Sequence, residues 1–151
     1  MPETMPRTEP SEQPTTGSPS AAGYPIVFFD GECGFCNANV AFAMPRADDA
    51  VRFAPLQGET AAALLSESQR DLSTMVYRDA QGRVSLRSTA ALNLGARFGG
   101  LWPVLAAAGR LVPRPLRDGV YRLIARNRHR LPGSKDSCRL PTPEESARFL
   151  P

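Results

Sequence analysis

The sequence predicts one α/β domain in which helices cover a mixed β-sheet. An apolar segment, 24–29, stops at Asp30-Gly31 and leads into an alanine-rich stretch, and a buried strand that enters a helix in this way is typical of α/β folds. Two short β-prone segments, 74–77 and 84–86, flank a polar link with a glycine, which indicates an antiparallel hairpin. A chain of 151 residues, 42% of them hydrophobic, is long enough to bury one core.

The first strand and helix are defined by the residues at their ends. Residues 24–29 are rich in β-branched and aromatic side chains, which favour a strand. Gly31 suits the turn that follows, because glycine adopts backbone angles that other residues resist. We expect the helix to begin near Cys33 and to end before Pro45, since a proline disfavours the helical conformation in the residue before it.

The middle of the chain predicts further elements of the same sheet. Residues 51–56 indicate a strand, and the alanine-rich residues 59–65 indicate a helix. After the hairpin, the hydroxyl of Ser88 or Thr89 is placed to cap a helix that continues through Leu94, because such a side chain accepts hydrogen bonds from unpaired backbone N–H groups.

Two helical segments are expected beyond this point. The run from Leu101 to Val112 is the most apolar of the chain and predicts a buried helix, with a helix lying on a membrane surface as the alternative. The second helix has an apolar stripe at helical spacing, formed by Leu116, Val120, Leu123 and Ile124.

The ends of the chain differ in composition from its centre. Residues 1–22 hold five prolines among Ser, Thr and Glu, so we expect a disordered tail there, a domain over 23–133 and a C-terminal tail over 134–151. Acidic residues in the first segment argue against a secretory or organellar signal, and cytoplasmic localisation is the expectation. No run approaches the roughly 20 apolar residues of a membrane-spanning helix, so no transmembrane span is expected.

The pair Cys33 and Cys36 carries the chemistry that the sequence suggests. Residues three apart on a helix are neighbours, so the two sulfurs can form a disulfide, and a helix N-terminus favours a thiolate at the first cysteine. Cys33 would then attack a substrate disulfide and Cys36 would resolve the mixed disulfide. Asp30 could accept or return the proton of Cys36, or it could simply form the turn. We take these three residues as the candidate catalytic set.

The segment from Asp30 to Cys36 resembles the Asp-Gly-x-Cys-x-x-Cys signature of the DCC family of thiol-disulfide oxidoreductases. The resemblance covers about residues 24–133 and includes further segments at 53–57, 87–92, 117–121 and 124–128. It implies a thioredoxin-like three-layer fold with extra C-terminal helices and a protein-disulfide oxidoreductase activity. The partners would be a protein or small-molecule disulfide and an unidentified thiol electron donor, thioredoxin-type or glutathione.

One position departs from the pattern that this resemblance implies. Thioredoxin-like proteins place a cis-proline just before the third strand, beside the disulfide, where it helps to position the substrate backbone. Ser73-Thr74 stands at that place in this chain. We therefore expect substrate docking to differ from that of an ordinary thioredoxin.

Two other classes of function compete with the redox interpretation. A zinc site would need Cys33 and Cys36 together with His129 and Cys138, but the spacing of the latter two matches no common zinc pattern, so no metal or other cofactor is expected. Cys138 is interpreted as an incidental loop cysteine, with a third redox thiol as the alternative.

The other class is a binding module for an anionic partner. From Arg110 to the end, ten Lys or Arg face four acidic residues. Nucleic acid is not the expected partner, because only Tyr121 and Phe149 supply aromatic rings in this part of the chain. The sequence carries no signal for the oligomeric state.

Overall fold

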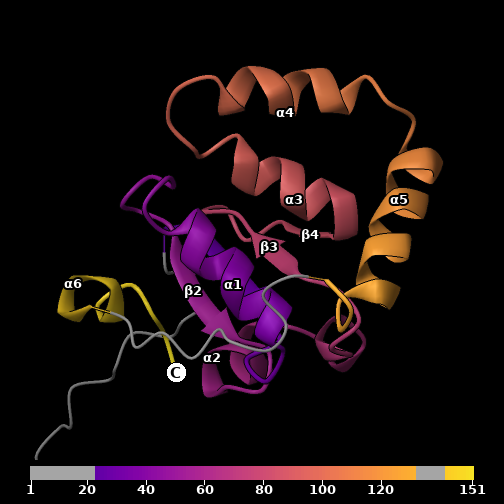
Figure 1. The fold of residues 1–151 in the computed structure, drawn as a ribbon. Helices are drawn as coiled ribbons and strands as arrows, with labels where there is room; N and C mark the ends of the chain where they lie inside the picture. Colours follow the sequence, from indigo (N-terminus) through magenta and orange to yellow (C-terminus); the bar gives the residue numbers. More distant parts are fainter. Residues whose placement is uncertain (1–22, 132–141) are drawn as a thin grey trace, which may run out of the picture.

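The computed structural model describes residues 23–131 and 142–151, and its strands form one mixed sheet (Figure 1). The strand order is β2-β1-β3-β4, with β1 parallel to β2 and the other neighbouring pairs antiparallel. The strands are β1 (Ile26–Phe29), β2 (Arg52–Pro55), β3 (Val76–Arg78) and β4 (Val84–Leu86). The hairpin predicted from its polar link is confirmed, and Gly82 in the link has a φ of +88°, which favours glycine.

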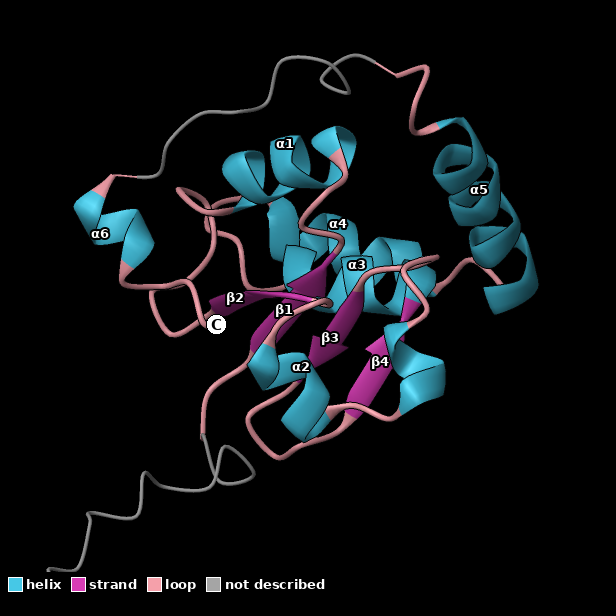
Figure 2. Ribbon diagram, turned by 90° about the horizontal axis from the view of Figure 1, so that it is seen from below, coloured by secondary structure: helices cyan, strands magenta, loops and turns pink. Residues whose placement is uncertain are grey.

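Helices cover both faces of this sheet, as the alternating side chains of β1 require. Val27 and Phe29 pack with residues of α1 (Gly34–Ala43) and α3 (Arg87–Gly95). Ile26 and Phe28 point the other way and pack with α2 (Glu59–Leu64). A short 3₁₀ helix, η2 (Glu67–Arg70), follows α2. Figure 2 shows α1 and α2 on opposite sides of the strands. This three-layer α/β arrangement agrees with the predicted thioredoxin-like fold.

The start of α3 differs from the sequence prediction. The residue before the helix is Leu86, the end of β4, and neither Ser88 nor Thr89 caps it, so that prediction is wrong. The strand runs directly into the helix, and the backbone N–H of Arg87 donates instead to the Thr74 hydroxyl at 3.0 Å. Ser88 is buried within the helix and donates its hydroxyl to Asp118. A long-range contact thus replaces the local cap.

The apolar run 101–112 forms a helix, but its burial was predicted wrongly. Helix α4 (Trp102–Arg110) packs on the outside of α3, with Ala106 as its buried residue. A Cβ on Gly109 would lie 2.8 Å from Leu92 Cδ2, so the glycine permits a close approach of the two helices. The opposite side of α4 is exposed. Helix α5 (Arg114–Asn127) follows, and none of the described helices is long and apolar enough to cross a membrane.

The last ten residues pack along the free edge of β2. They contain the short helix α6 (Pro143–Ser146), after which Phe53 and Phe149 pair as a β-bridge. The N–H of Phe53 donates to the carbonyl of Arg148 at 2.9 Å, and the N–H of Leu150 donates to the carbonyl of Phe53 at 2.8 Å. Residues 142–151, which the sequence analysis assigned to a tail, therefore extend the sheet edge.

Arg148 holds this segment against the domain, and its replacement by methionine should lower stability. Its guanidinium donates to three backbone carbonyls, those of Met44, Asp48 and Val51, at 2.8, 2.9 and 3.2 Å. Hydrogen bonds from a charged donor contribute more than neutral ones, so we expect Arg148→Met to lower the free energy of unfolding by about 2 kcal/mol in urea titrations. Arg126→Met, on the exposed side of α5, is the matched control and should change it by less than about 0.5 kcal/mol. Equal urea midpoints for Arg148→Met and Arg126→Met would show that the contacts of Arg148 do not contribute to the stability of the domain.

Candidate functional site

Cys33 and Cys36 lie at the N-terminus of α1, as the sequence predicted. Cys33 is the N-cap residue, with an extended backbone, and its sulfur accepts a hydrogen bond from the backbone N–H of Cys36 at 3.4 Å. Both cysteines are free thiols in this structure. The unpaired N–H groups of the first turn and the helix dipole favour negative charge on the sulfur at this end.

The turn before the cysteines uses Gly31 for a different reason from the one predicted. Its φ is not in the left-handed region. A Cβ there would lie 3.2 Å from the Cβ of Pro55, so the glycine allows a close approach of the turn to β2. Its N–H donates to the side chain of Gln57 and its carbonyl accepts from the side chain of Asn37, at 3.1 and 3.0 Å. These contacts fix the entry into α1.

Asp30 forms the turn and also lies beside the cysteines. Its Oδ1 accepts from the N–H of Glu32 at 3.0 Å and from Nε2 of Gln57 at 2.7 Å. Its Oδ2 lies 3.8 Å from Nη2 of Arg128, and its side chain is only 12% exposed. The carboxylate is near enough to Cys36 for its charge to raise the pKa of that thiol. Asp30 is thus a turn-forming residue whose second oxygen faces the site.

The two thiols lie in different electrostatic environments. Burial raises the pKa of Cys36 to about 12, and a hydrogen bond with Cys33 and the charge of Cys33 act in the same direction. The guanidinium of Arg128 opposes them and lowers the pKa. At neutral pH the Cys36 thiol therefore keeps its proton.

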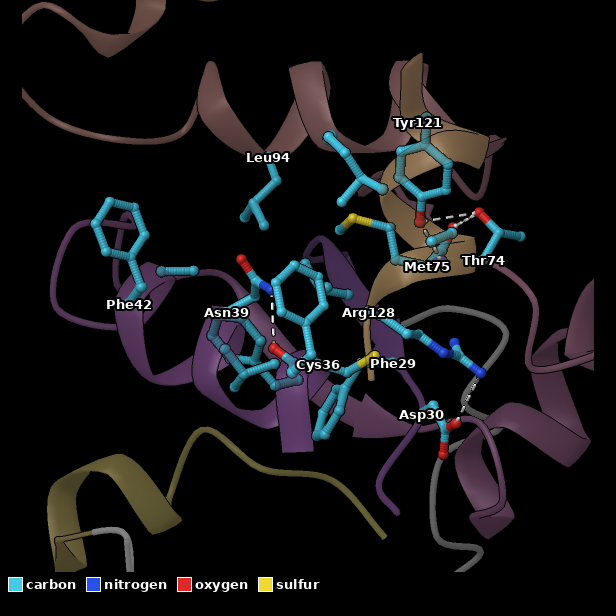
Figure 3. Close-up of a pocket in the computed structure, with 18 of the residues that line it drawn as sticks. Phe29, Asp30, Cys36, Asn39, Phe42, Thr74, Met75, Leu94, Tyr121 and Arg128 are labelled. Atoms are coloured by element: carbon cyan, nitrogen blue, oxygen red, sulfur yellow. Dashed lines mark hydrogen bonds and ion pairs between the residues drawn. The ribbon is translucent and has the colours of Figure 1, made fainter. Parts of the chain in front are cut away.

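Arg128 is a site residue that the sequence analysis missed. It follows the end of α5 and reaches Asp30 (Figure 3). Its Nη1 donates to the carbonyl of Leu72 at 3.1 Å. Leu72 has a φ of +62°, a left-handed conformation that is rare for leucine. Nothing in the local sequence separates Arg128 from Arg126 and Arg130, which are exposed. Only the docking of α5 brings it to the cysteines.

A cavity of about 380 Å³ adjoins Cys36. Most of its lining is apolar and comes from several strands and helices, and Figure 3 shows some of these side chains near the sulfur of Cys36. They include Phe35 of α1, Met75 before β3, Leu94 of α3 and Ile124 of α5. The charged lining residues are Asp30 and Arg128. The cavity can therefore receive an apolar group next to the cysteine pair.

Ser73-Thr74, at the place of the expected proline, leads to a small hydrogen-bond cluster. The peptide bond between them is trans. The Thr74 hydroxyl lies 3.2 Å from the hydroxyl of Tyr121, and that phenol accepts from the N–H of Met75 at 2.9 Å. The Tyr121 side chain of α5 therefore accepts the hydrogen bond of the Met75 backbone N–H at the edge of the cavity. This contact joins α5 to the start of β3.

The remaining candidates from the sequence are not brought to this site. His129 is exposed in the turn after α5. Cys138 lies outside the described residues. Within 23–131 and 142–151, no group of three His, Cys, Asp or Glu side chains is arranged to hold a metal ion.

The asymmetry of the two thiols predicts their titration. In a Cys138→Ser protein, Cys36 should stay protonated at pH values well below its raised pKa of about 12. Cys33→Ala in the same background should lower the pKa of Cys36 by on the order of one unit or more, since the partner's charge and hydrogen bond disappear. Thiolate absorbance measured against pH gives the ionisation of Cys36 in the presence and in the absence of Cys33. Two thiolates near neutrality, or a Cys36 pKa that ignores the substitution, would contradict this arrangement.

Comparison with known proteins agrees with this geometry. Residues 27–134 match the family model described as DCC1-like thiol-disulfide oxidoreductase. The chain is 38% identical over 131 residues to the uncharacterized protein YuxK of Bacillus subtilis (strain 168), an alignment that covers 83% of this chain and 93% of that protein. It is 34% identical over 120 residues to a chloroplastic DCC family protein, At1g52590, of Arabidopsis thaliana, which covers 77% and 69% of the two chains. No solved structure matches it. The chain belongs to the DCC1-like family of thiol-disulfide oxidoreductases.

Proposed function

We propose that the chain is a protein-disulfide reductase in which Cys33 is the nucleophile and Cys36 the resolving thiol. The observation that carries this proposal is the position of Cys33 as the N-cap of α1, where its sulfur accepts the N–H of Cys36. Thiol-disulfide exchange needs one thiolate and one thiol held in reserve. The raised pKa of Cys36 keeps this second thiol protonated until it is needed.

The proposed reaction moves two electrons from the cysteine pair to a substrate disulfide. The Cys33 thiolate attacks one substrate sulfur, a mixed disulfide forms, and the other substrate sulfur leaves as a thiolate. Cys36 then loses its proton and attacks the Cys33 sulfur, which releases the second substrate thiolate. The chain is left with a Cys33-Cys36 disulfide, and a thiol donor must reduce it before the next cycle.

The charge balance at the site favours this order of events. In the reduced pair, the hydrogen bond and the charge of Cys33 both raise the pKa of Cys36. The mixed disulfide removes the charge of Cys33, so the pKa of Cys36 falls when that thiol is needed. Arg128 continues to favour the Cys36 thiolate, and Asp30 is the nearby carboxylate proposed to accept its proton.

The shape of the site favours polypeptide substrates. Cys33 is only 6% exposed, whereas Cys36 lines the apolar cavity, so a substrate must bring its sulfur down beside that cavity. An apolar side chain next to the substrate cysteine would fill it. Glutathione is a poorer match, because its carboxylates need cations, and the cationic lining residue, Arg128, already faces Asp30.

The alternatives keep less support than the redox function. A zinc site has only Cys33 and Cys36 among the described residues, since His129 is exposed at the end of α5. The hypothesis of a basic binding module does not account for the pair at a helix N-terminus beside a cavity. We propose a reducing compartment, the cytoplasm, because working thiols need a reduced donor pool.

A redox titration tests the proposed function. Thiol alkylation of the wild type across a series of redox buffers should show one reversible two-electron couple, and reduction of a protein disulfide should require both cysteines. Cys33→Ser should abolish turnover, while Cys138→Ser is the matched control and should retain it. Failure of the pair to form a disulfide in oxidising buffer, or turnover by the Cys33→Ser protein, would refute the proposal.

The role of Asp30 has its own test, because asparagine keeps the turn but cannot accept a proton. The amide oxygen of the new side chain would still accept from the N–H of Glu32, and loss of the negative charge should lower the pKa of Cys36. If Asp30 is the base, Asp30→Asn should slow resolution of a preformed mixed disulfide roughly 100-fold at neutral pH. Rapid-quench alkylation measures this rate. A rate that is unchanged or faster would leave Asp30 as a turn-forming residue alone.

A further inference from the structure

The outward face of α4 is an apolar surface without a partner in the described chain. Leu101, Val104 and Leu105 are 66%, 60% and 52% exposed, and Leu111 at the end of the helix is 86% exposed. Their spacing places them on one side, opposite the residues that contact α3 and α1. Trp102 on that inner side contacts Phe42 and Phe98 edge to face. The helix is therefore held by one face and offers the other to the exterior (Figure 1).

This apolar face lies in a segment that carries only positive charge. Residues 80–117 contain six arginines and no Asp or Glu. Arg114 is exposed at the start of α5, just beyond Leu111, whereas Arg110 donates to Oδ1 of Asn93 on α3 at 3.0 Å. An exposed aliphatic helix face with a cationic side chain close by, here Arg114, is a composition that binds anionic membrane surfaces.

We propose that the chain binds the surface of an anionic lipid bilayer through α4. The helix lies in the interfacial plane with Leu101, Val104, Leu105 and Leu111 among the acyl chains, and Arg114 at the start of α5 contacts the headgroup phosphates. The bilayer does not cover the end of α1 that carries the cysteines in this orientation. Trp102 of α4 contacts Phe42 near the C-terminal end of α1, whereas Cys33 and Cys36 lie at its other end.

A second copy of the chain, its own terminal segments or a protein partner would fit the outward face of α4 less well than an anionic bilayer. A symmetric dimer through α4 would bring Arg114 of two copies together, while Asp118 already faces the charge of Arg114 within its own copy. The segments 1–22 and 132–141 offer only Met1, Met5 and Leu140 as large apolar residues, too few to cover it. The outward α4 side chains are aliphatic and carry no hydrogen-bonding group to select a protein partner, whereas a bilayer requires none.

Vesicle binding by the full chain tests the proposal. The chain should co-sediment with vesicles of phosphatidylcholine and phosphatidylglycerol, bind pure phosphatidylcholine at least tenfold more weakly, and lose affinity as salt rises. Leu105→Asp should weaken binding to the mixed vesicles at least tenfold. Arg114→Gln, which leaves the apolar face intact, should weaken it about fivefold.

Leu123→Asp is the matched control, because Leu123 is 62% exposed on α5, away from α4. This variant should bind the mixed vesicles like the wild type. A urea titration of each variant shows whether the domain remains folded. No binding to anionic vesicles, equal losses for Leu105→Asp and Leu123→Asp, or a wild-type dimer that Leu105→Asp dissociates would overturn the proposal.

Discussion

The sulfur of Cys33 caps α1 by accepting the backbone N–H of Cys36, and this contact links the fold to the chemistry. A cap of this kind needs an extended residue at the end of a turn, which β1 and the Asp30-Gly31 segment provide. It also needs α1 to leave the sheet close to β2, and Gly31 permits that approach to Pro55. Burial of Cys36 raises the pKa of that thiol, and this contact with Cys33 acts in the same direction.

The C-terminal helices complete the site from a distance in the sequence. Tyr121 of α5 accepts from the backbone at the start of β3, and Arg128 reaches Asp30 across the turn. Both contacts depend on how α5 packs beside α3. Arg128 is 20% exposed and lowers the pKa of Cys36, so the helix influences the proposed resolving thiol without supplying a sulfur of its own.

Local patterns were sufficient to predict the elements, but not the contacts between them. The strand at 24–29, the helix after Cys33 and the hairpin follow from side-chain type and turn residues, and each is present. The helix-capping role of Ser88 or Thr89 was wrong, because Thr74 from another segment satisfies the N–H of Arg87. The burial of 101–112 was also wrong, since apolar content alone does not show which side of a helix finds a partner. Arg128 could not be singled out, because its partners Asp30 and Leu72 are far away in the sequence.

The central claim is that Cys33 is the nucleophile and Cys36 the resolving thiol. Solvent exposure alone would suggest the reverse, because Cys36 lines the cavity and Cys33 is nearly buried. Peptide mapping of a trapped mixed disulfide tests it most directly. With a disulfide-bonded polypeptide as substrate, Cys36→Ser in a Cys138→Ser background should accumulate a covalent complex joined through Cys33. The Cys33→Ser protein should form little or none at neutral pH, because the remaining thiol is protonated. A stable complex through Cys36 in the Cys33→Ser protein, with none through Cys33, would contradict the account.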